Sequence, residues 1–219
     1  MARVVVAAFG LTLSLLTSLA AQPQQDRATE AQLGTAASEV PRLVEALGLR
    51  PGMTVADVGA GYGAHTITLS KWLGPNGRVF ASEVGASQLE ALHEAVAREP
   101  LPNVTVIEGA AQSTNLPAGC CDAIFIRDVY HHLTAPAAIN RSLAAALKPG
   151  GRLAVIDFRP RPDTAVPDGV PADRLGHGVP IEVVEREVSA AGLTHVRTEG
   201  AWSGGGQPAN LYLVLFQKP

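Results

Sequence analysis

The sequence is poor in charged residues, in aromatic residues and in cysteine. Of its 219 residues, only 17% are Asp, Glu, Lys or Arg, 5% are aromatic and two are cysteine. Soluble domains carry about 25% charged residues, so this chain, with 47% hydrophobic residues, is apolar for its size. Two cysteines exclude a disulfide-rich scaffold, and the apolar content excludes a disordered or collagen-like chain.

The chain also lacks a basic cluster and spaced cysteines. Its 17 Lys and Arg residues are scattered, and the formal net charge is −3. Binding to nucleic-acid phosphates needs a clustered positive face, so we expect no nucleic-acid partner. Cys120 and Cys121 are adjacent, a spacing that rarely closes a disulfide and gives no zinc pattern by itself. We expect two small buried side chains at the start of a strand, although export would allow their oxidation.

Part of the apolar excess lies at the N-terminus. Residues 4–21 hold no charge, follow a single Arg3 and end in small side chains, a pattern typical of a secretory signal peptide. We predict that residues 1–21 are a signal peptide or, as the alternative, an uncleaved N-terminal anchor. The protein would then be exported or periplasmic, with membrane contact only through this segment if it is retained. The polar, Gln-rich residues 22–37 are predicted to be a linker to a single domain over 38–219.

Strand and helix patterns alternate beyond the predicted linker. Alternation with helices of about ten residues indicates an α/β domain with a parallel sheet. Residues 55–58 and 154–156 are nearly all apolar, as expected for strands covered on both faces. We therefore predict a Rossmann-like, doubly wound sheet. The expected strands are 54–58, 78–83, 104–108, 122–126, 152–157, 195–199 and 211–216, and the expected helices are 38–47, 64–73, 87–98, 136–147 and 181–191.

A glycine-rich turn, VADVGAGYGAHT at 55–66, follows the first expected strand. Glycines allow a tight turn and close approach of backbone N–H groups to a ligand, and the following helix N-terminus favours negative charge. Glu83 ends the second strand, where a carboxylate can accept ribose hydroxyls. The string also fits the G-x-G-x-x-A pattern of dinucleotide folds. Asp57 stands where those folds usually have an apolar residue, and the chain has no second catalytic domain.

Four segments carry a resemblance to a known family. They are VADVGAGYG at 55–63, RVFASEV at 78–84, CCDAIFIRDVYHHL at 120–133 and LKPGGRLAVIDF at 147–158. Together they resemble the class I S-adenosylmethionine-dependent methyltransferases, and among these a group of predicted exported bacterial methyltransferases. The resemblance implies a seven-stranded sheet, mostly parallel with the last strand antiparallel. It also implies S-adenosylmethionine as the cofactor and an unidentified small molecule as the methyl acceptor.

The resemblance further implies where the cofactor binds. Asp57 and the glycines of the turn would surround its methionine part, and Glu83 would hold the ribose hydroxyls. The loop after the third strand would flank the adenine, with Gln112 as a hydrogen-bond acceptor where many relatives carry an Asp nearby. The implied cofactor-binding residues are Asp57, Gly59, Gly61, Gly63, Glu83, Ala110, Ala111, Gln112 and Arg127.

Methyl transfer is an in-line displacement at carbon, so the protein contributes alignment, desolvation and, where needed, a base. The site of such a sheet lies at the carboxyl ends of its strands. We predict Asp128, Tyr130 and His131 as the acceptor-side catalytic residues, because they follow the fourth strand. For His131, packing beneath the next helix is the alternative.

Three further residues, Asp157, Arg159 and His177, are candidates to line the acceptor pocket, with solvated loop positions as the alternative. We expect no metal, since the adjacent His131 and His132 lack the i, i+4 spacing of a helical zinc pair. Two other functions compete with methyl transfer: a non-catalytic cofactor-binding module of the same fold, and a nicotinamide-dependent oxidoreductase.

Overall fold

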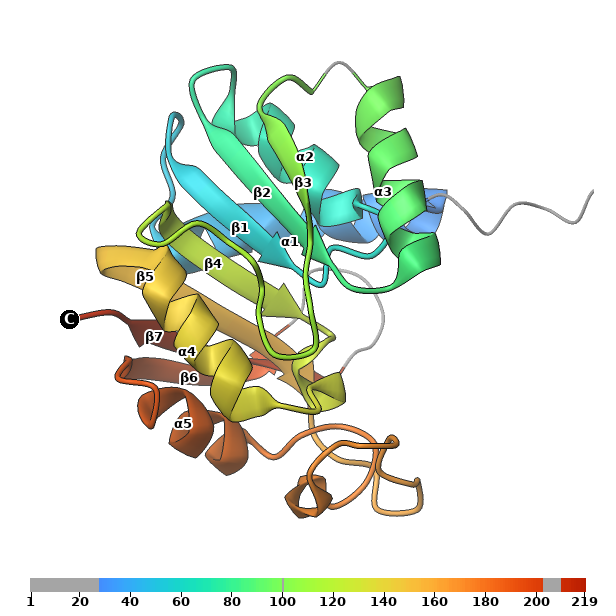
Figure 1. Ribbon diagram of the computed structural model, residues 1–219, viewed down its shortest axis with the longest axis vertical. Coiled ribbons are helices and arrows are strands. Elements are labelled where there is room, and N and C mark those ends of the chain that lie inside the picture. The colour runs from blue at the N-terminus through green and yellow to red at the C-terminus, as the bar shows by residue number, and fades with distance from the viewer. Residues whose placement is uncertain (1–27, 100, 203–209) are drawn as a thin grey trace, which may run out of the picture.

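Strands and helices alternate along the computed structural model, which describes residues 28–99, 101–202 and 210–219 (Figure 1). The strands are β1 (Thr54–Val58), β2 (Arg78–Glu83), β3 (Val104–Glu108), β4 (Cys121–Arg127), β5 (Leu147–Phe158), β6 (Thr194–Trp202) and β7 (Leu211–Gln217). The helices are α1 (Glu30–Leu47), α2 (Ala64–Leu73), α3 (Ala86–Arg98), α4 (Pro136–Ala146) and α5 (Ile181–Ser189), with short 3₁₀ helices η1 (Tyr130–His132) and η2 (Ala172–Arg174).

The seven strands form one sheet in the order β3-β2-β1-β4-β5-β7-β6. Strands β1 to β5 pair in parallel, and β7 runs antiparallel to both of its neighbours, β5 and β6. The predicted fold class, a Rossmann-like sheet that is mostly parallel with an antiparallel last strand, is therefore confirmed.

Both faces of the sheet are buried. Neighbouring residues of a strand point to opposite faces, and in β1 Val55 belongs to one apolar cluster while Ala56 belongs to the other. The first cluster includes side chains of α1 and α2, and the second includes side chains of α4 and α5. Helix α3 packs beside α2 through a small third cluster that contains Ala95. This double coverage explains why the central strands are almost entirely apolar.

The strand order places several of the predicted site residues at one edge of the sheet. The chain runs outward from β1 through β2 to β3 and then returns to pair β4 with the other side of β1. Ligands of doubly wound sheets bind at such a reversal, outside the carboxyl ends of the strands. The turn after β1, Glu83 at the end of β2 and Arg127 at the end of β4 therefore meet at the same edge.

Helix α1 begins at Glu30, earlier than the expected start at residue 38. Thr29 caps its N-terminus, and the side chain of Gln32 accepts the Thr29 backbone N–H in return, which forms a capping box. The predicted linker 22–37 is therefore wrong from residue 30 onward. The first turns of α1 are mostly solvent-exposed, and Leu33 is the one large apolar residue in them. They therefore carry no apolar periodicity that would distinguish a helix from a linker.

Cys120 and Cys121 form a disulfide with each other, so the expectation of two unpaired cysteines is wrong. Cys121 is buried at the start of β4, as expected, whereas Cys120 is partly exposed. The predicted signal peptide or anchor, residues 1–21, lies outside the described residues. Within the described part of the chain, none of the helices has the length and apolar character of a membrane span.

Candidate active site

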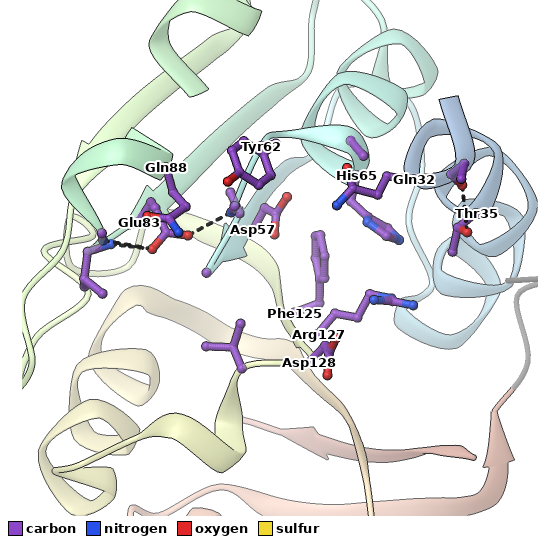
Figure 2. Close-up of a pocket in the computed structure, with 18 of the residues that line it drawn as sticks. Gln32, Thr35, Asp57, Tyr62, His65, Glu83, Gln88, Phe125, Arg127 and Asp128 are labelled. Carbon is purple, nitrogen blue, oxygen red and sulfur yellow. Dashed lines mark hydrogen bonds between the residues drawn. The ribbon is translucent and has the colours of Figure 1, made fainter. Parts of the chain in front are cut away.

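A pocket of about 1070 Å³ opens at the carboxyl ends of β1, β2 and β4 (Figure 2). Figure 2 shows Glu83 on one side of it, Arg127 and Asp128 across from Glu83, and α1 residues on a third side. Its lining comprises Ala31, Gln32, Gly34, Thr35, Asp57, Gly59, Ala60, Gly61, Tyr62, Ala64, His65, Glu83, Val84, Gly85, Gln88, Phe125, Arg127, Asp128 and Val129.

Two glycines of the turn have conformations that other residues rarely adopt. Gly59 and Gly61 have φ angles of 76° and 53°. A Cβ at Gly59 would clash with the side chain of Val129, so the turn can pass this close to the end of β4 only with glycine there. A Cβ at Gly61 would meet nothing within 4 Å, because Gly61 borders the open pocket. The turn thus presents bare backbone to whatever occupies the pocket.

Glu83 is fixed by backbone N–H groups. One carboxylate oxygen accepts the N–H of Gly61 at 2.8 Å, and the other accepts those of Val84 and Gly85 at 2.7 and 3.1 Å. Charge-assisted hydrogen bonds of this kind hold a carboxylate in a single orientation. Each carboxylate oxygen offers about two acceptor sites, so acceptor capacity remains for donors in the pocket.

Asp57 lies at the floor of the pocket and is buried. Its carboxylate accepts a hydrogen bond of 2.7 Å from the hydroxyl of Thr66 in α2. Burial raises the pKa of Asp57, and the nearby charge of Glu83 adds to the rise, while His65 and Thr66 oppose it. The floor therefore holds an acceptor whose negative charge would be stabilised by a cationic ligand group.

A second buried carboxylate, Glu39, ties the walls of the pocket together. One of its oxygens accepts from Arg127 Nε at 2.7 Å and lies 3.3 Å from His65 Nε2, and the other accepts from Trp202 Nε1 at 2.6 Å. Burial by itself would raise the pKa of Glu39. The His65 hydrogen bond, the Arg127 charge and the Trp202 hydrogen bond outweigh burial and lower this pKa to about 2.

Asp128 lies across the pocket from Glu83 and has a φ of 60°, an unusual value for a non-glycine residue. Its backbone N–H donates to Ile156 O at 2.8 Å, so pairing with β5 holds this conformation. Burial raises the pKa of Asp128, and the charge of Asp157 adds to this effect, whereas Arg127 opposes it. Strained backbone conformations are concentrated at functional sites.

The structure brings six of the sequence-predicted residues to this pocket: Asp57, Gly59, Gly61, Glu83, Arg127 and Asp128. Gly63 lies behind the turn as the N-cap of α2, and the loop Ala110, Ala111 and Gln112 is exposed away from the lining.

Tyr130 and His131 are buried beside the pocket rather than in its wall. The Tyr130 hydroxyl donates to Glu187 at 2.9 Å and accepts from Asn140 Nδ2 at 2.7 Å. Burial, together with the charge of Glu187, raises the pKa of Tyr130 far above its ordinary value. His131 Nδ1 lies 2.9 Å from a carboxylate oxygen of the buried Asp157.

Sequence reasoning missed the wall that α1 contributes, including Gln32 and Thr35, and it missed Glu39. A signal for Glu39 was present. Together with Ala36, Val40 and Leu43, Glu39 falls on the buried face of the helix at i, i+3, i+4 and i+7 spacing. A carboxylate on an apolar helix face is almost never fully buried unless it is paired, so its position predicts buried partners.

We predict that Glu39→Gln lowers the free energy of unfolding by about 3 kcal/mol near neutral pH, because it breaks a buried ion pair. The lowered pKa of Glu39 stabilises the fold above its ordinary value of about 4.3, and this stabilisation is lost as pH falls toward about 2. The gap between wild type and variant should therefore shrink in that window. Urea unfolding at several pH values measures this difference in free energy of unfolding, and Glu45→Gln, at an exposed position of α1, is the control. A difference that does not change with pH would contradict the buried ion pair of Glu39.

Comparisons with known proteins agree with this architecture. Residues 55–151 match the family described as methyltransferase domain. The chain is 32% identical over 122 residues to the ubiquinone/menaquinone biosynthesis C-methyltransferase of Shewanella woodyi. The aligned segment covers 55% of this chain and 49% of that relative. The chain thus spans about half the length of the curated relatives that it matches.

Two solved structures extend the likeness beyond the matched segment. A SAM-dependent methyltransferase from Aquifex aeolicus superposes with a TM-score of 0.69 and 26% identity, covering 88% of this chain and 95% of the other. A possible exported protein from Bordetella parapertussis, 19% identical, shares the fold with a TM-score of 0.62 over 88% of this chain and 68% of the other. Residues 55–151 thus match a methyltransferase domain, and the described chain has the Rossmann-like fold of the Aquifex aeolicus SAM-dependent methyltransferase.

Proposed function

We propose that the protein transfers a methyl group from S-adenosylmethionine to a small-molecule acceptor. The observation that carries this proposal is the position of Glu83, whose carboxylate is fixed by three backbone N–H groups at one side of a large pocket that Asp128 lines across from it. This arrangement suits a nucleoside ligand held at one side and a reactive group presented at the other.

The residues of the pocket fit the proposed cofactor. The bare backbone at Gly61 leaves room for a ligand against the turn. Glu83 has one acceptor site left for a ribose hydroxyl, on the oxygen that accepts only the Gly61 N–H, and Asp57 places a carboxylate where the cationic methionine part would bind. When bound, S-adenosylmethionine supplies an electrophilic methyl group on a sulfonium.

Asp128 is the proposed general base or orienting acceptor for the methyl-accepting group. It lines the pocket, and its raised pKa brings it closer to the working pH that a base requires. The Arg127–Glu39 pair next to it holds the end of β4 in place. We assign Tyr130 and His131 a positioning role, because both side chains are tied to buried acidic partners directly after Asp128.

The acceptor is proposed to be a small molecule. The curated relatives are C-methyltransferases of quinone biosynthesis, and the pocket of about 1070 Å³ would hold the cofactor with a modest acceptor beside it. A screen of metabolite fractions for methyl transfer from labelled S-adenosylmethionine would identify the acceptor. We also retain export, directed by residues 1–21, as a proposal that fractionation of cells expressing the full chain would test.

Calorimetric titration separates the competing functions. The proposal predicts heat with S-adenosylhomocysteine and none with NADH. Binding of NADH alone would favour an oxidoreductase, and cofactor binding without transfer to any fraction of the screen would favour a non-catalytic binding module.

We predict that Glu83→Gln weakens S-adenosylhomocysteine binding about tenfold or more, because charged hydrogen bonds to the ribose are worth roughly 1.5–3 kcal/mol. Glu108→Gln is the matched control, since Glu108 pairs with Glu83 in register at the end of β3 and is exposed outside the pocket. Titration of both variants, with circular dichroism to verify folding, provides the measurement. Wild-type affinity in Glu83→Gln would place the ribose elsewhere.

We predict that Asp128→Asn lowers kcat about 100-fold, the typical worth of a general base, and leaves the affinity for S-adenosylhomocysteine within about threefold. A base acts when deprotonated, so the wild-type rate should rise with pH through the raised pKa of Asp128 and then level off. Asp128→Asn should lose that rise. Initial rates across pH on an acceptor from the screen provide the measurement, and an unchanged kcat would remove Asp128 from the reaction.

A further inference from the structure

Three imidazoles meet next to the pocket, at the carboxyl ends of β4 and β5. His131 and His132 belong to η1, and His177 comes from the long loop between β5 and α5 (Figure 1). The ring centroid of His131 lies 4.0 Å from that of His132 and 4.8 Å from that of His177. One ring nitrogen from each residue lies within 4.8 Å of the other two, so the three could converge on one ion.

The loop is built to bring His177 to this place. Gly176 and Gly178 flank it with φ angles of 128° and 124°. A Cβ at Gly176 would clash with the Arg161 carbonyl, and one at Gly178 would lie 2.8 Å from the Arg159 carbonyl. The backbone of His177 is fixed on both sides, since its carbonyl accepts from Arg161 N at 3.0 Å and its N–H donates to Thr164 at 2.9 Å. Only glycine allows so close an approach of the two chain segments.

His131 is oriented by a buried carboxylate. Asp157 accepts from the His131 backbone N–H at 3.1 Å, and its other oxygen lies 2.9 Å from Nδ1. A proton on Nδ1 shared with Asp157 leaves the lone pair on Nε2, which is the carboxylate–histidine arrangement that supports metal-binding imidazoles. Among the described residues, the ring nitrogens of His132 and His177 have no hydrogen-bond partner.

We propose that His131, His132 and His177 bind one divalent transition-metal ion of the zinc type, with Asp157 as the orienting carboxylate. Imidazole nitrogens suit zinc, and three protein ligands leave a fourth position open, as in catalytic zinc sites. Metal–nitrogen bonds of about 2.0–2.1 Å require the nitrogens to approach to about 3.3 Å in a tetrahedral site. The exposed His132 and the partly buried His177 have room to make this adjustment.

The site would serve the proposed function at its acceptor end. Asp128 lines the cofactor pocket, and its carboxylate also lies within 4.8 Å of ligand atoms of His131 and Asp157. The two groups share His131, so a metal at the imidazoles would lie beside the end of the pocket that Asp128 lines, where it could bind an oxygen, nitrogen or sulfur atom of the acceptor. This role rests on the proposed function, whereas metal binding itself does not.

The test uses the full chain without a polyhistidine tag, stripped with a chelator and titrated with Zn²⁺ by calorimetry and with Co²⁺ by visible absorption. We expect one ion per chain with a Kd on the order of 1 µM or lower, and Co²⁺ bands typical of a low-coordinate nitrogen site. His132→Ala and His177→Ala should each weaken Zn²⁺ binding at least tenfold. Asp157→Asn should weaken it about 10- to 100-fold. The control, His93→Ala, changes an exposed residue of α3 and should have no effect.

Two results would overturn the metal site. One is the absence of stoichiometric Zn²⁺ or Co²⁺ binding to folded wild-type protein, and the other is binding that neither His132→Ala nor His177→Ala weakens. In either case the imidazoles are a packed aromatic cluster only. Titration of the same samples with S-adenosylhomocysteine keeps the two proposals apart. His177→Ala should retain cofactor binding, and failure of wild type to bind the cofactor would count against the proposed function without affecting the metal result.

Discussion

The buried carboxylate of Glu39 joins four elements that are far apart in the chain. It pairs with Arg127 at the end of β4, contacts His65 in α2 and accepts from Trp202 at the end of β6. An unpaired charge buried here would cost several kcal/mol, so these three partners help to hold α1 in place together with its buried apolar face. Because α1 also supplies one wall of the pocket, this charged group contributes to the shape of the pocket.

The rest of the site follows from the reversal of strand order between β1 and β4. The turn after β1 can pass close to Val129 because Gly59 has no Cβ, and the same turn donates the Gly61 backbone N–H to Glu83. On the other side of β4, Asp128 adopts its left-handed conformation because its N–H pairs with β5. Backbone geometry thus positions the polar groups at both ends of the pocket, and few of them rely on flexible side chains.

The acidic residues near the proposed acceptor end of the pocket have distinct environments. Asp157 is buried and used by His131 and by backbone N–H groups, whereas Asp128 reaches the pocket and has a raised pKa. Carboxylates in different surroundings can perform different tasks within one site. Here the buried one orients an imidazole, and the pocket-lining one is left for the chemistry that we propose.

The sequence by itself determined the sheet, the glycine-rich turn and the carboxylate at Glu83, because these depend on local periodicity and on short spacings within one strand–turn–helix unit. It also placed Asp128 at the correct edge. Only the tertiary structure decided that α1 extends to Glu30 and lines the pocket, that Tyr130 turns inward to Glu187, and that His177 joins His131. Those outcomes depend on contacts between residues far apart in the chain. No local pattern encodes them, since a polar helix surface resembles a linker and a loop histidine carries no sign of its partners.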